Sequence, residues 1–311
     1  MALLFVKDID SRSCYIAYLC NGTLVVSIIL KEYFNSEFVS VVTGATDGIG
    51  KEYAKELALR GINIVLVSRN EAKLRETAYE IESNYKVKAK VVAVDFSIGS
   101  KAIEVVKHKV YDLPIGILVN NVGRQYSYPM YLGEVPEQEL WDIININVGA
   151  TTMMTHLIVK GMKERRRGAI VNISSGAELQ PLPLMNVYAA SKTYISYFTE
   201  ALREEYARYG VTVQHLSPYF INTKMNNFSD KLRETTVFVP DAKTYAKYAI
   251  NTLGKVNCTT GYWAHGVQHF FTTLPPTWIR MKVGKELNKS FRQEYFERQN
   301  KTEKNGNHTP S

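Results

Sequence analysis

Cysteines, long apolar runs and charged residues are all scarce in this sequence, and each shortage excludes a class of protein. The 311 residues include three cysteines, Cys14, Cys20 and Cys258, with no C-x-x-C pair, which argues against a zinc site or a scaffold held by several disulfides. Charged residues make up 22% of the chain and apolar residues 45%, so a disordered or collagen-like chain is excluded as well. What remains is a basic chain, of net charge +8, with enough apolar residues for a buried core.

No segment is long enough and apolar enough to be a clear transmembrane helix. The most apolar segment, Cys14–Leu30, contains polar residues such as Asn21 and Ser27 and falls short of the roughly 20 predominantly apolar residues that a span needs. The segment fits either a buried helix or an attachment to a membrane. We therefore expect residues 1–37 to form a hydrophobic N-terminal arm that is a candidate membrane anchor.

Short β-branched runs alternate with helical patterns between residues 38 and 218. The runs are apolar nearly throughout, which is typical of strands covered on both faces. They are Phe38–Thr43, Ile62–Ser68, Val87–Asp95, Ile115–Asn121, Ala169–Ser174 and Val211–Pro218. Between the second and third runs, Glu71–Tyr85 places Leu74, Ala78 and Ile81 on one helical face.

Six such runs joined by helices predict an α/β fold built on a doubly wound parallel sheet of the Rossmann type. We expect a single domain over residues 38–299, whose C-terminal extension covers the substrate, followed by a disordered polar tail at 300–311. Ligands of such sheets bind at the carboxyl ends of the strands, so the motifs at those ends carry the functional argument.

A glycine-rich turn follows the first predicted strand. The sequence from Thr43 to Gly50 spaces its glycines as G-x-x-x-G-x-G, which allows a sharp turn and brings backbone N–H groups close to a pyrophosphate. The following helix directs its positive N-terminus at the same phosphate, so the turn predicts a dinucleotide site rather than a plain connector. Its candidate cofactor-binding residues are Gly44, Thr46, Asp47, Gly48, Ile49 and Gly50.

The ends of the next strands indicate which dinucleotide binds. NAD sites place an acid after the second strand and NADP sites a basic residue, and Arg69 occupies this position. An arginine there also fits plain solvated surface, but the missing acid favours NADPH/NADP+ as the cofactor. Asp95 follows the third strand, where it can meet the adenine amino group, and Asn121 follows the fourth and lines the pocket. Asp95, and Asn120 next to Asn121, also fit purely structural roles.

Tyr188 and Lys192 open a predicted helix and lie one turn apart on the same face. A free phenol, with a pKa of about 10, is a poor acid–base at neutral pH, and a cation one turn away stabilises its phenolate. Ser175, just past the fifth strand, has a hydroxyl placed to bond the substrate oxygen that Tyr188 protonates. Asn147 lies in a long predicted helix, where asparagine is unfavourable, which fits either a catalytic role or the repair of a bent helix.

In their order and spacing these residues resemble the short-chain dehydrogenase/reductase family, over about 39–288. The matching motifs are the Thr-Gly-x-x-x-Gly-x-Gly turn from Thr43, Asn-Asn-Val-Gly from Asn120, Ser175, and Tyr188-x-x-x-Lys192. Further stretches are similar to the branch of 17β-hydroxysteroid dehydrogenases and very-long-chain 3-oxoacyl-CoA reductases. They are Gly44–Lys51, Ser68–Asn70 and Thr260–Trp263.

The resemblance implies a role for each matched residue. Tyr188 would be the general acid, while Lys192 would lower its pKa and hold the nicotinamide ribose. Ser175 would position the carbonyl, Asn147 would anchor a water of the proton relay, and Thr223 would contact the cofactor carboxamide.

This chain differs from the family's usual pattern after the sixth strand, and the region that follows offers candidate substrate contacts. The family often has Pro-Gly after the sixth strand, where this chain has Pro218-Tyr219, which puts the local cofactor contact in doubt. The region after Thr223 supplies an apolar wall for the expected substrate. Its candidate residues are Phe228, Val237, Phe238, Tyr262, Trp263, Phe270, Phe271 and Trp278.

These inferences predict an NADPH-dependent oxidoreductase that reduces the carbonyl of a lipophilic substrate, a 17-ketosteroid or a 3-oxoacyl-CoA, with Tyr188 as general acid/base. The alternative is a catalytically silent NADP-binding scaffold, like a member of the branch whose motif tyrosine is replaced by phenylalanine, although this chain keeps its tyrosine. We expect a homodimer associated with the endoplasmic reticulum membrane or, alternatively, the mitochondrion. The basic run Lys163–Arg167 ends a helix, where cations suit the macrodipole, so we expect no nucleic-acid partner.

Overall fold

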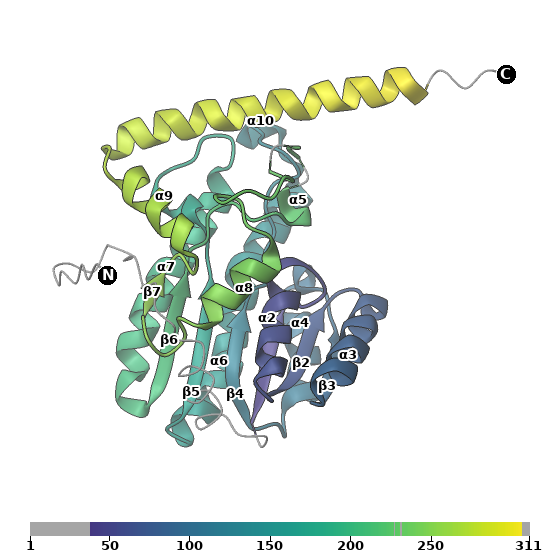
Figure 1. Cartoon of the computed structure of the whole chain (residues 1–311), viewed down its shortest axis with the longest axis vertical. Coiled ribbons are helices and arrows are strands. Elements are labelled where there is room, and N and C mark those ends of the chain that lie inside the picture. The colour runs from purple at the N-terminus through teal and green to yellow at the C-terminus, as the bar shows by residue number, and fades with distance from the viewer. Residues whose placement is uncertain (1–37, 227, 231, 307–311) are drawn as a thin grey trace.

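A seven-stranded parallel sheet forms the centre of the molecule in the computed structural model, which describes residues 38–226, 228–230 and 232–306 (Figure 1). The strand order is β3-β2-β1-β4-β5-β6-β7. From β1 the chain adds β2 and β3 on one side, and it then crosses to add β4 to β7 on the other side, so the strand order switches between β1 and β4. The strands are β1 (Val39–Thr43), β2 (Asn63–Ser68), β3 (Ala89–Ala93), β4 (Ile115–Asn120), β5 (Gly168–Ile173), β6 (Val211–Leu216) and β7 (Cys258–Thr259). The predicted doubly wound α/β fold is confirmed.

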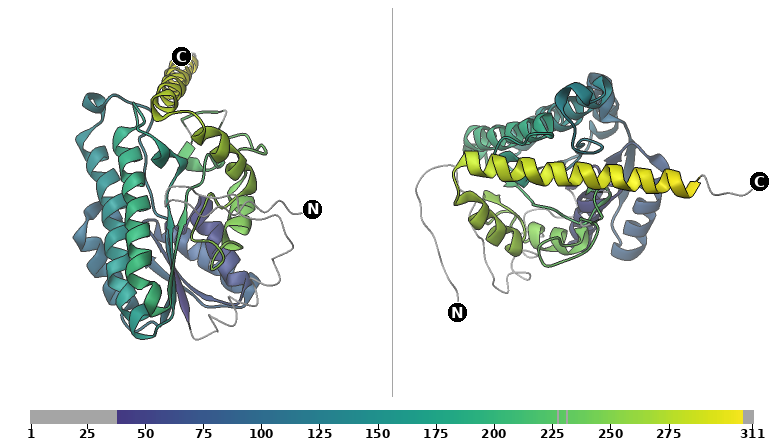
Figure 2. Two further views of the ribbon diagram at one scale, coloured as in Figure 1. Left: turned by 90° about the vertical axis from the view of Figure 1, so that its left-hand side faces the viewer. Right: turned by 90° about the horizontal axis from the view of Figure 1, so that it is seen from above.

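Helices cover both faces of the sheet (Figure 2). The apolar residues of one face form a core with α2 (Gly48–Leu59), α3 (Glu71–Tyr85) and α8 (Ala242–Ile250). Those of the other face form a second core with α4 (Ser100–Val110) and the long α6 and α7. The remaining helical elements are η1 (Phe96–Ile98), η2 (Leu132–Glu134), α5 (Glu137–Ile143), the π-helix η3 (Ile144–Ala150), α6 (Thr151–Glu164), η4 (Gly176–Leu179), α7 (Asn186–Tyr206), η5 (Ala207–Tyr209), η6 (Lys224–Asn226), α9 (Trp263–Thr273) and α10 (Thr277–Gly306).

The six predicted strands lie within the predicted runs or within one residue of them, and the sequence missed only β7. This strand has two residues, paired as His215 with Cys258 and Leu216 with Thr259, and is too short to produce a sequence signal. At the other edge, β3 is only partly buried, because it is the outermost strand of the sheet formed by the described residues.

The C-terminal helix α10 lies across the carboxyl ends of the strands (Figures 1 and 2). Two contacts hold it to the loop after β4: Arg292 forms an ion pair with Glu134 at 2.7 Å, and Tyr295 stacks on Tyr128 with the ring centres 4.1 Å apart. The side chain of Asn288 also donates to the Pro183 carbonyl at 2.8 Å. The C-terminal extension therefore covers the site end of the sheet, as predicted.

The two ends of the chain differ in what the structure describes. α10 continues to Gly306, so residues 300–306 are helical, where we predicted the start of a disordered tail. The predicted N-terminal arm, residues 1–37, lies outside the described residues. Within the described part of the chain, no helix is long and apolar enough to cross a membrane.

Candidate active site

One large cavity, of about 1170 Å³, opens at the carboxyl ends of the strands. Its floor is the glycine turn and the ends of β2 to β6, and its roof is the C-terminal part of α9 with the first half of α10. Of the predicted site residues, all except Asn147 and Gly50 line this cavity, which therefore brings the cofactor and catalytic motifs together.

The glycine turn is shaped for close backbone contacts. Gly44 has φ of +68° and Gly48 has φ of +53°, a region that side chains disfavour. Gly50 has no room for a side chain, because a Cβ would overlap the Asn121 amide nitrogen and the Gly44 carbonyl oxygen. The Asn121 amide donates to the carbonyl of Thr43 at 2.9 Å and so ties the turn to the end of β4. The first N–H groups of α2 consequently face the cavity on a fixed support.

Cations surround the end of the cavity that lies at the carboxyl end of β2. Arg69 is exposed there, and Lys73 and Lys224, which the sequence analysis did not single out, also line the wall. Lys224 pairs with Asp47 across the cavity mouth. Burial raises the pKa of Asp47, but the hydrogen bonds from Lys224 and from the Gly48 N–H outweigh this effect, so its pKa is lowered overall. Lys73 could have been found from the sequence, because it lies four residues after Arg69, in the first turn of the following helix.

Three other residues predicted to bind the cofactor, Thr46, Asp95 and Thr223, line the cavity. Each also contacts a neighbouring part of the protein. Thr46 shares a hydrogen bond of 3.0 Å with Ser68 at the end of β2. Asp95 accepts a hydrogen bond from the Ser97 N–H at 2.9 Å and so caps η1. Thr223 faces Gly48 from across the cavity, 3.2 Å from where a Cβ of that glycine would lie.

Tyr188 and Lys192 are both buried at the base of the cavity, with exposed fractions of 7% and 4%. Burial raises the pKa of Tyr188; the Ser175 hydroxyl, which bonds the phenol, opposes the shift, and the Glu178 carboxylate adds to it. Burial lowers the pKa of Lys192 to about 8, against the opposing charge of Glu178. The Lys192 ammonium donates to the Ile173 carbonyl at 3.1 Å. The predicted lowering of the tyrosine pKa is therefore not found in the protein alone, because desolvation dominates.

Asn147 lies fully buried in the π-helix η3, which interrupts the helix predicted from the sequence. Its side-chain amide donates to the Ser191 hydroxyl at 2.8 Å and to the Arg124 carbonyl at 2.9 Å, and its oxygen accepts from the Arg124 N–H at 2.8 Å. These contacts join α7 to the loop after β4. Asn147 thus serves a bent helix, and its role toward a catalytic water stays a prediction.

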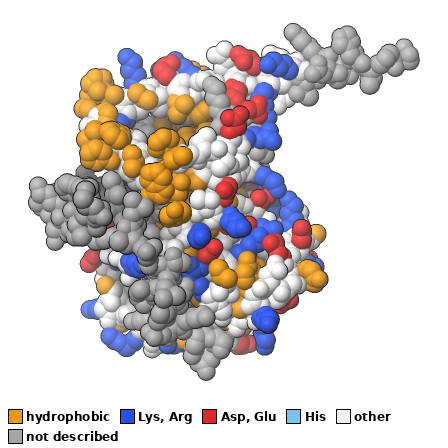
Figure 3. All heavy atoms as spheres, in the orientation of Figure 1, with side chains coloured by type: hydrophobic (Ala, Val, Ile, Leu, Met, Phe, Trp, Pro, Cys, Tyr) orange, Lys and Arg blue, Asp and Glu red, His pale blue; other side chains and the backbone are white. Residues whose placement is uncertain are grey.

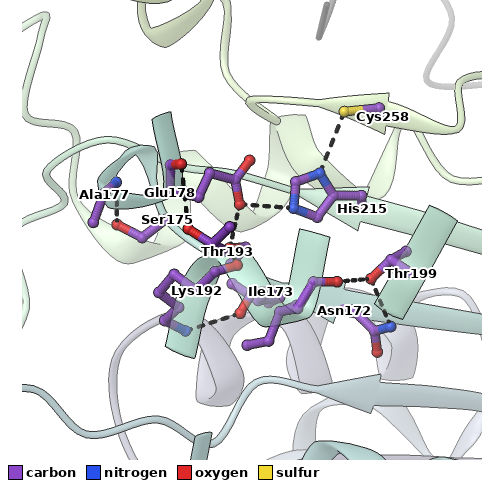
Figure 4. A network of polar contacts seen from close by, with 12 residues as sticks. Asn172, Ile173, Ser175, Ala177, Glu178, Lys192, Thr193, Thr199, His215 and Cys258 are labelled. Carbon is purple, nitrogen blue, oxygen red and sulfur yellow. Dashed lines mark hydrogen bonds and ion pairs between the residues drawn. The ribbon is translucent and has the colours of Figure 1, made fainter. Parts of the chain in front are cut away.

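The sequence analysis missed a buried acid beside the catalytic residues (Figure 4). Glu178, on η4, accepts a hydrogen bond from Ser174 and lies 3.0 Å from the Nε2 atom of His215 on β6. The Nδ1 atom of that histidine lies 3.3 Å from the sulfur of Cys258 on β7. No sequence motif joins residues so far apart, so only the fold could reveal the pair.

The substrate side of the cavity differs from the predicted apolar wall. Only Phe228 and Phe271 of that wall line the cavity. The wall instead comes largely from one side of α10, at Ile279, Val283, Leu287 and Phe291. Tyr219, which replaces the family's usual glycine, lies with its ring against Gly176, and burial raises its pKa to about 12.

The fold and this site define a short-chain dehydrogenase/reductase. Residues 39–234 match the family model described as short chain dehydrogenase, and the chain belongs to that family. It is 46% identical over 255 residues to the human "Inactive hydroxysteroid dehydrogenase-like protein 1" (82% of this chain, 77% of the relative). It is 42% identical over 268 residues to the human "Very-long-chain 3-oxoacyl-CoA reductase" (86% of this chain, 83% of the relative).

Solved structures show the same fold. A short-chain dehydrogenase from Sphingobium yanoikuyae in complex with NADPH is 25% identical, with a TM-score of 0.64, and covers 69% of this chain and 84% of its own. A structure described for 7beta-hydroxysteroid dehydrogenase stereoselectivity is also 25% identical, with a TM-score of 0.73, covering 82% of this chain and 98% of its own.

Proposed function

We propose that this chain is an NADPH-dependent carbonyl reductase that converts the ketone of a lipophilic substrate, a 17-ketosteroid or a 3-oxoacyl-CoA, into an alcohol. The observation that carries the proposal is that Tyr188, Lys192 and Ser175 meet in one cavity with the glycine turn. A tyrosine hydroxyl bonded to a serine, with a buried lysine one turn away, is a proton donor placed for a carbonyl oxygen.

The residues present fit NADPH. The glycine turn and the N-terminus of α2 offer backbone N–H groups to a pyrophosphate. At the adenosine end, Arg69, Lys73 and Lys224 supply positive charge for a 2′-phosphate, and Arg69 rather than an acid directly follows β2. The related structure solved with NADPH supports the same choice.

NADPH would supply a hydride to the carbonyl carbon. Tyr188 gives its phenolic proton to the carbonyl oxygen, and its raised pKa keeps it in the protonated form that reduction requires. The Ser175 hydroxyl, fixed at the start of η4 where it also accepts from the Ala177 N–H at 3.2 Å, orients that oxygen. Lys192 places a cation beside the phenolate left after proton transfer, with its nitrogen 5.8 Å from the centre of the Tyr188 ring.

The shape of the cavity supports a large apolar substrate. Its volume of about 1170 Å³ leaves space beside a dinucleotide, and the side chains of α10 that face it are mostly aliphatic or aromatic. The printed names of the relatives mention hydroxysteroid and 3-oxoacyl-CoA chemistry, and both substrate types are large and apolar. The substrate class is therefore tested with both.

The experiment is NADPH oxidation by the full chain with a panel of ketosteroids and 3-oxoacyl-CoAs, comparing the protein with Tyr188→Phe. We expect turnover on at least one substrate and its loss in the variant, with NADPH binding retained. Equal rates for the two proteins would remove Tyr188 as the proton donor.

A second candidate function is a catalytically silent NADP(H)-binding scaffold. It is favoured by the name of a relative that is 46% identical, which describes that protein as inactive. Against it, this chain keeps the hydroxyl of Tyr188 in a built site. Tight NADPH binding without turnover on any substrate of the panel would favour the scaffold.

We also propose association with the endoplasmic reticulum membrane, with the mitochondrion as the alternative. Hydrophobic side chains gather over α9 and the beginning of α10, beside the roof of the cavity (Figure 3), and Phe271, Leu274 and Trp278 are each more than half exposed. Exposed apolar patches of this kind mark membrane or protein contacts. Fractionation of cells that express the chain with and without residues 1–37, with organelle markers, separates the two locations.

We further propose a homodimer. Large apolar side chains are exposed on the helices opposite α8, among them Trp141 on α5, Met153 on α6 and Tyr197 on α7. Light scattering of the purified protein measures the oligomeric state, and a monomeric mass at micromolar concentration would contradict this proposal.

A further inference from the structure

The buried carboxylate of Glu178 joins three elements around the catalytic residues (Figure 4). Its Oε2 atom lies 3.0 Å from His215 on β6, and the side chains of the pair are 7% and 2% exposed. The same oxygen accepts the hydroxyl of Ser174, the last residue before Ser175. The oxygen of Ser174 in turn lies 3.0 Å from the backbone carbonyl of Lys192 on α7.

These contacts fix the turn that carries Ser175. Glu178 lies three residues after Ser175 on the same short 3₁₀ segment, and its own backbone carbonyl accepts from Thr193 on α7 at 3.4 Å. His215 is held in place by the sheet, since its N–H bonds the Asn257 carbonyl at 2.8 Å. The carboxylate of Glu178 therefore links the serine-bearing turn to a rigid strand, and its backbone carbonyl links the same turn to the tyrosine–lysine helix.

The same carboxylate sets the charge around the site. The Lys192 ammonium and the Tyr188 phenol both lie within the electrostatic influence of Glu178. Burying an acid is costly unless it is paired and hydrogen-bonded, and this acid has both a histidine and a serine as partners. Its negative charge opposes the desolvation that would otherwise discharge the lysine.

We propose that Glu178, locked by His215, is a positioning residue of the catalytic centre: it holds the Ser175 turn between β6 and α7 and places a buried carboxylate beside the helix that carries Lys192. This inference rests on the proposed use of NADPH, because Lys192 is the residue expected to hold the nicotinamide ribose.

The other titratable groups facing Glu178 are few. Among the described residues, His215 faces it from β6, Tyr188 and Lys192 from α7, Tyr219 from the segment after β6, and His269 from α9. The charge of Arg280, on α10, acts on His269 and opposes the effect of Glu178 there. Lys192 is the cation among them that the loss of one carboxylate charge would affect within the range of pH 6 to 10.

The experiment measures NADPH affinity of the full chain by fluorescence titration from pH 6 to pH 10. The protein is compared with Glu178→Gln, which keeps the size and one acceptor oxygen but removes the charge, and with Glu178→Asp, which keeps the charge. Glu205→Gln removes an exposed carboxylate from the same helix as Lys192 and serves as the matched control.

We expect affinity to fall at high pH as Lys192 loses its proton, and we expect this inflection to move to lower pH by about one unit in E178Q. In E178D and E205Q it should stay within a few tenths of a unit of the parent value. His215→Gln leaves the carboxylate in place, so its inflection should not move to lower pH. These readouts need no turnover, so a silent protein that binds NADPH still tests the inference.

Three results would overturn the proposal. One is a uniform loss of affinity in E178Q at every pH with an unchanged inflection, which indicates a merely structural role. Another is the same downward shift in H215Q, where the charge remains. The third is an unshifted inflection in E178Q with unchanged affinity. Should E178Q fail to fold, a downward shift in folded E178D would equally contradict the proposal, because that variant retains the charge.

Discussion

Lys192 and Tyr188 lie on one face of α7, yet the ammonium of Lys192 bonds the carbonyl of Ile173 at the end of β5 and not the phenol. The cation is thus anchored to the sheet at 3.1 Å while the phenol bonds Ser175. The two groups interact through space, and each has its own support. We therefore expect mutation of Tyr188 to change the rate of catalysis and mutation of Lys192 to change the pH dependence of stability.

Tyr188→Phe should lower kcat for carbonyl reduction by a factor of about 100 to 10,000, the range that general acid catalysis contributes, while NADPH affinity stays within a few fold. Steady-state kinetics and fluorescence titration check the two effects. Tyr197→Phe, at an exposed position of the same helix, should leave both unchanged. An equal loss in both variants would contradict the role of Tyr188.

Lys192→Met should change the pH dependence of stability in a defined direction. The lysine has a folded-state pKa of about 8 and an ordinary value of 10.5, so below pH 8 the folded state buries a charge. Between pH 8 and 10.5 the folded protein releases that proton before the unfolded chain does, which stabilises it by up to about 3 kcal/mol. The Tm of the parent minus that of K192M, without cofactor, should rise from pH 7 to pH 10. A constant difference would show that the lysine pKa is not lowered.

Gly50→Ala should abolish NADPH binding and destabilise the fold by about 1–3 kcal/mol, because its methyl group would overlap the Asn121 amide and the Gly44 carbonyl. Gly133→Ala is the matched control, since no atom lies within 4 Å of the corresponding position. Urea unfolding and cofactor titration measure the two effects. Normal NADPH affinity in G50A would show that the turn does not hold the pyrophosphate.

Arg69→Glu should weaken NADPH binding at least tenfold and improve NADH binding, because it places an acid where NAD sites have one and removes a cation from the 2′-phosphate. Arg75→Glu makes the same charge change on an exposed face of α3 and should affect neither cofactor by more than about twofold. Titration with both dinucleotides measures the ratio. An unchanged ratio in R69E would assign cofactor choice to Lys73 and Lys224 instead.

Much of the site could be predicted because it is encoded locally. The glycine turn and Ser175 follow strand ends, and the Tyr188–Lys192 pair lies in the first two turns of α7. Parallel strands bring all their carboxyl ends to one edge. At Asn147 the helix departs from α geometry, and its amide bonds Ser191 and Arg124, while its catalytic role stays a prediction.

The residues that sequence reasoning missed depend on long-range packing. Lys224 reaches Asp47 from 177 positions away. The α10 side chains reach the cavity because long-range contacts, such as those of Arg292 and Tyr295 with the loop after β4, hold that helix over it. Of the residues predicted for the substrate wall, Phe228 and Phe271 line the cavity and the others do not, since composition cannot tell which side chains of a segment are turned inward.

The sequence by itself determined the α/β class, the strand edges and the three side chains proposed to be catalytic, because apolar periodicity and motif spacing are properties of neighbouring residues. Only the tertiary structure decided the electrostatics. Burial of Tyr188 and Lys192 moves their pKa values in opposite directions, and Glu178 with His215 places a charge beside them. Desolvation and Coulomb interactions depend on distance and burial in space, which spacing along the chain does not encode.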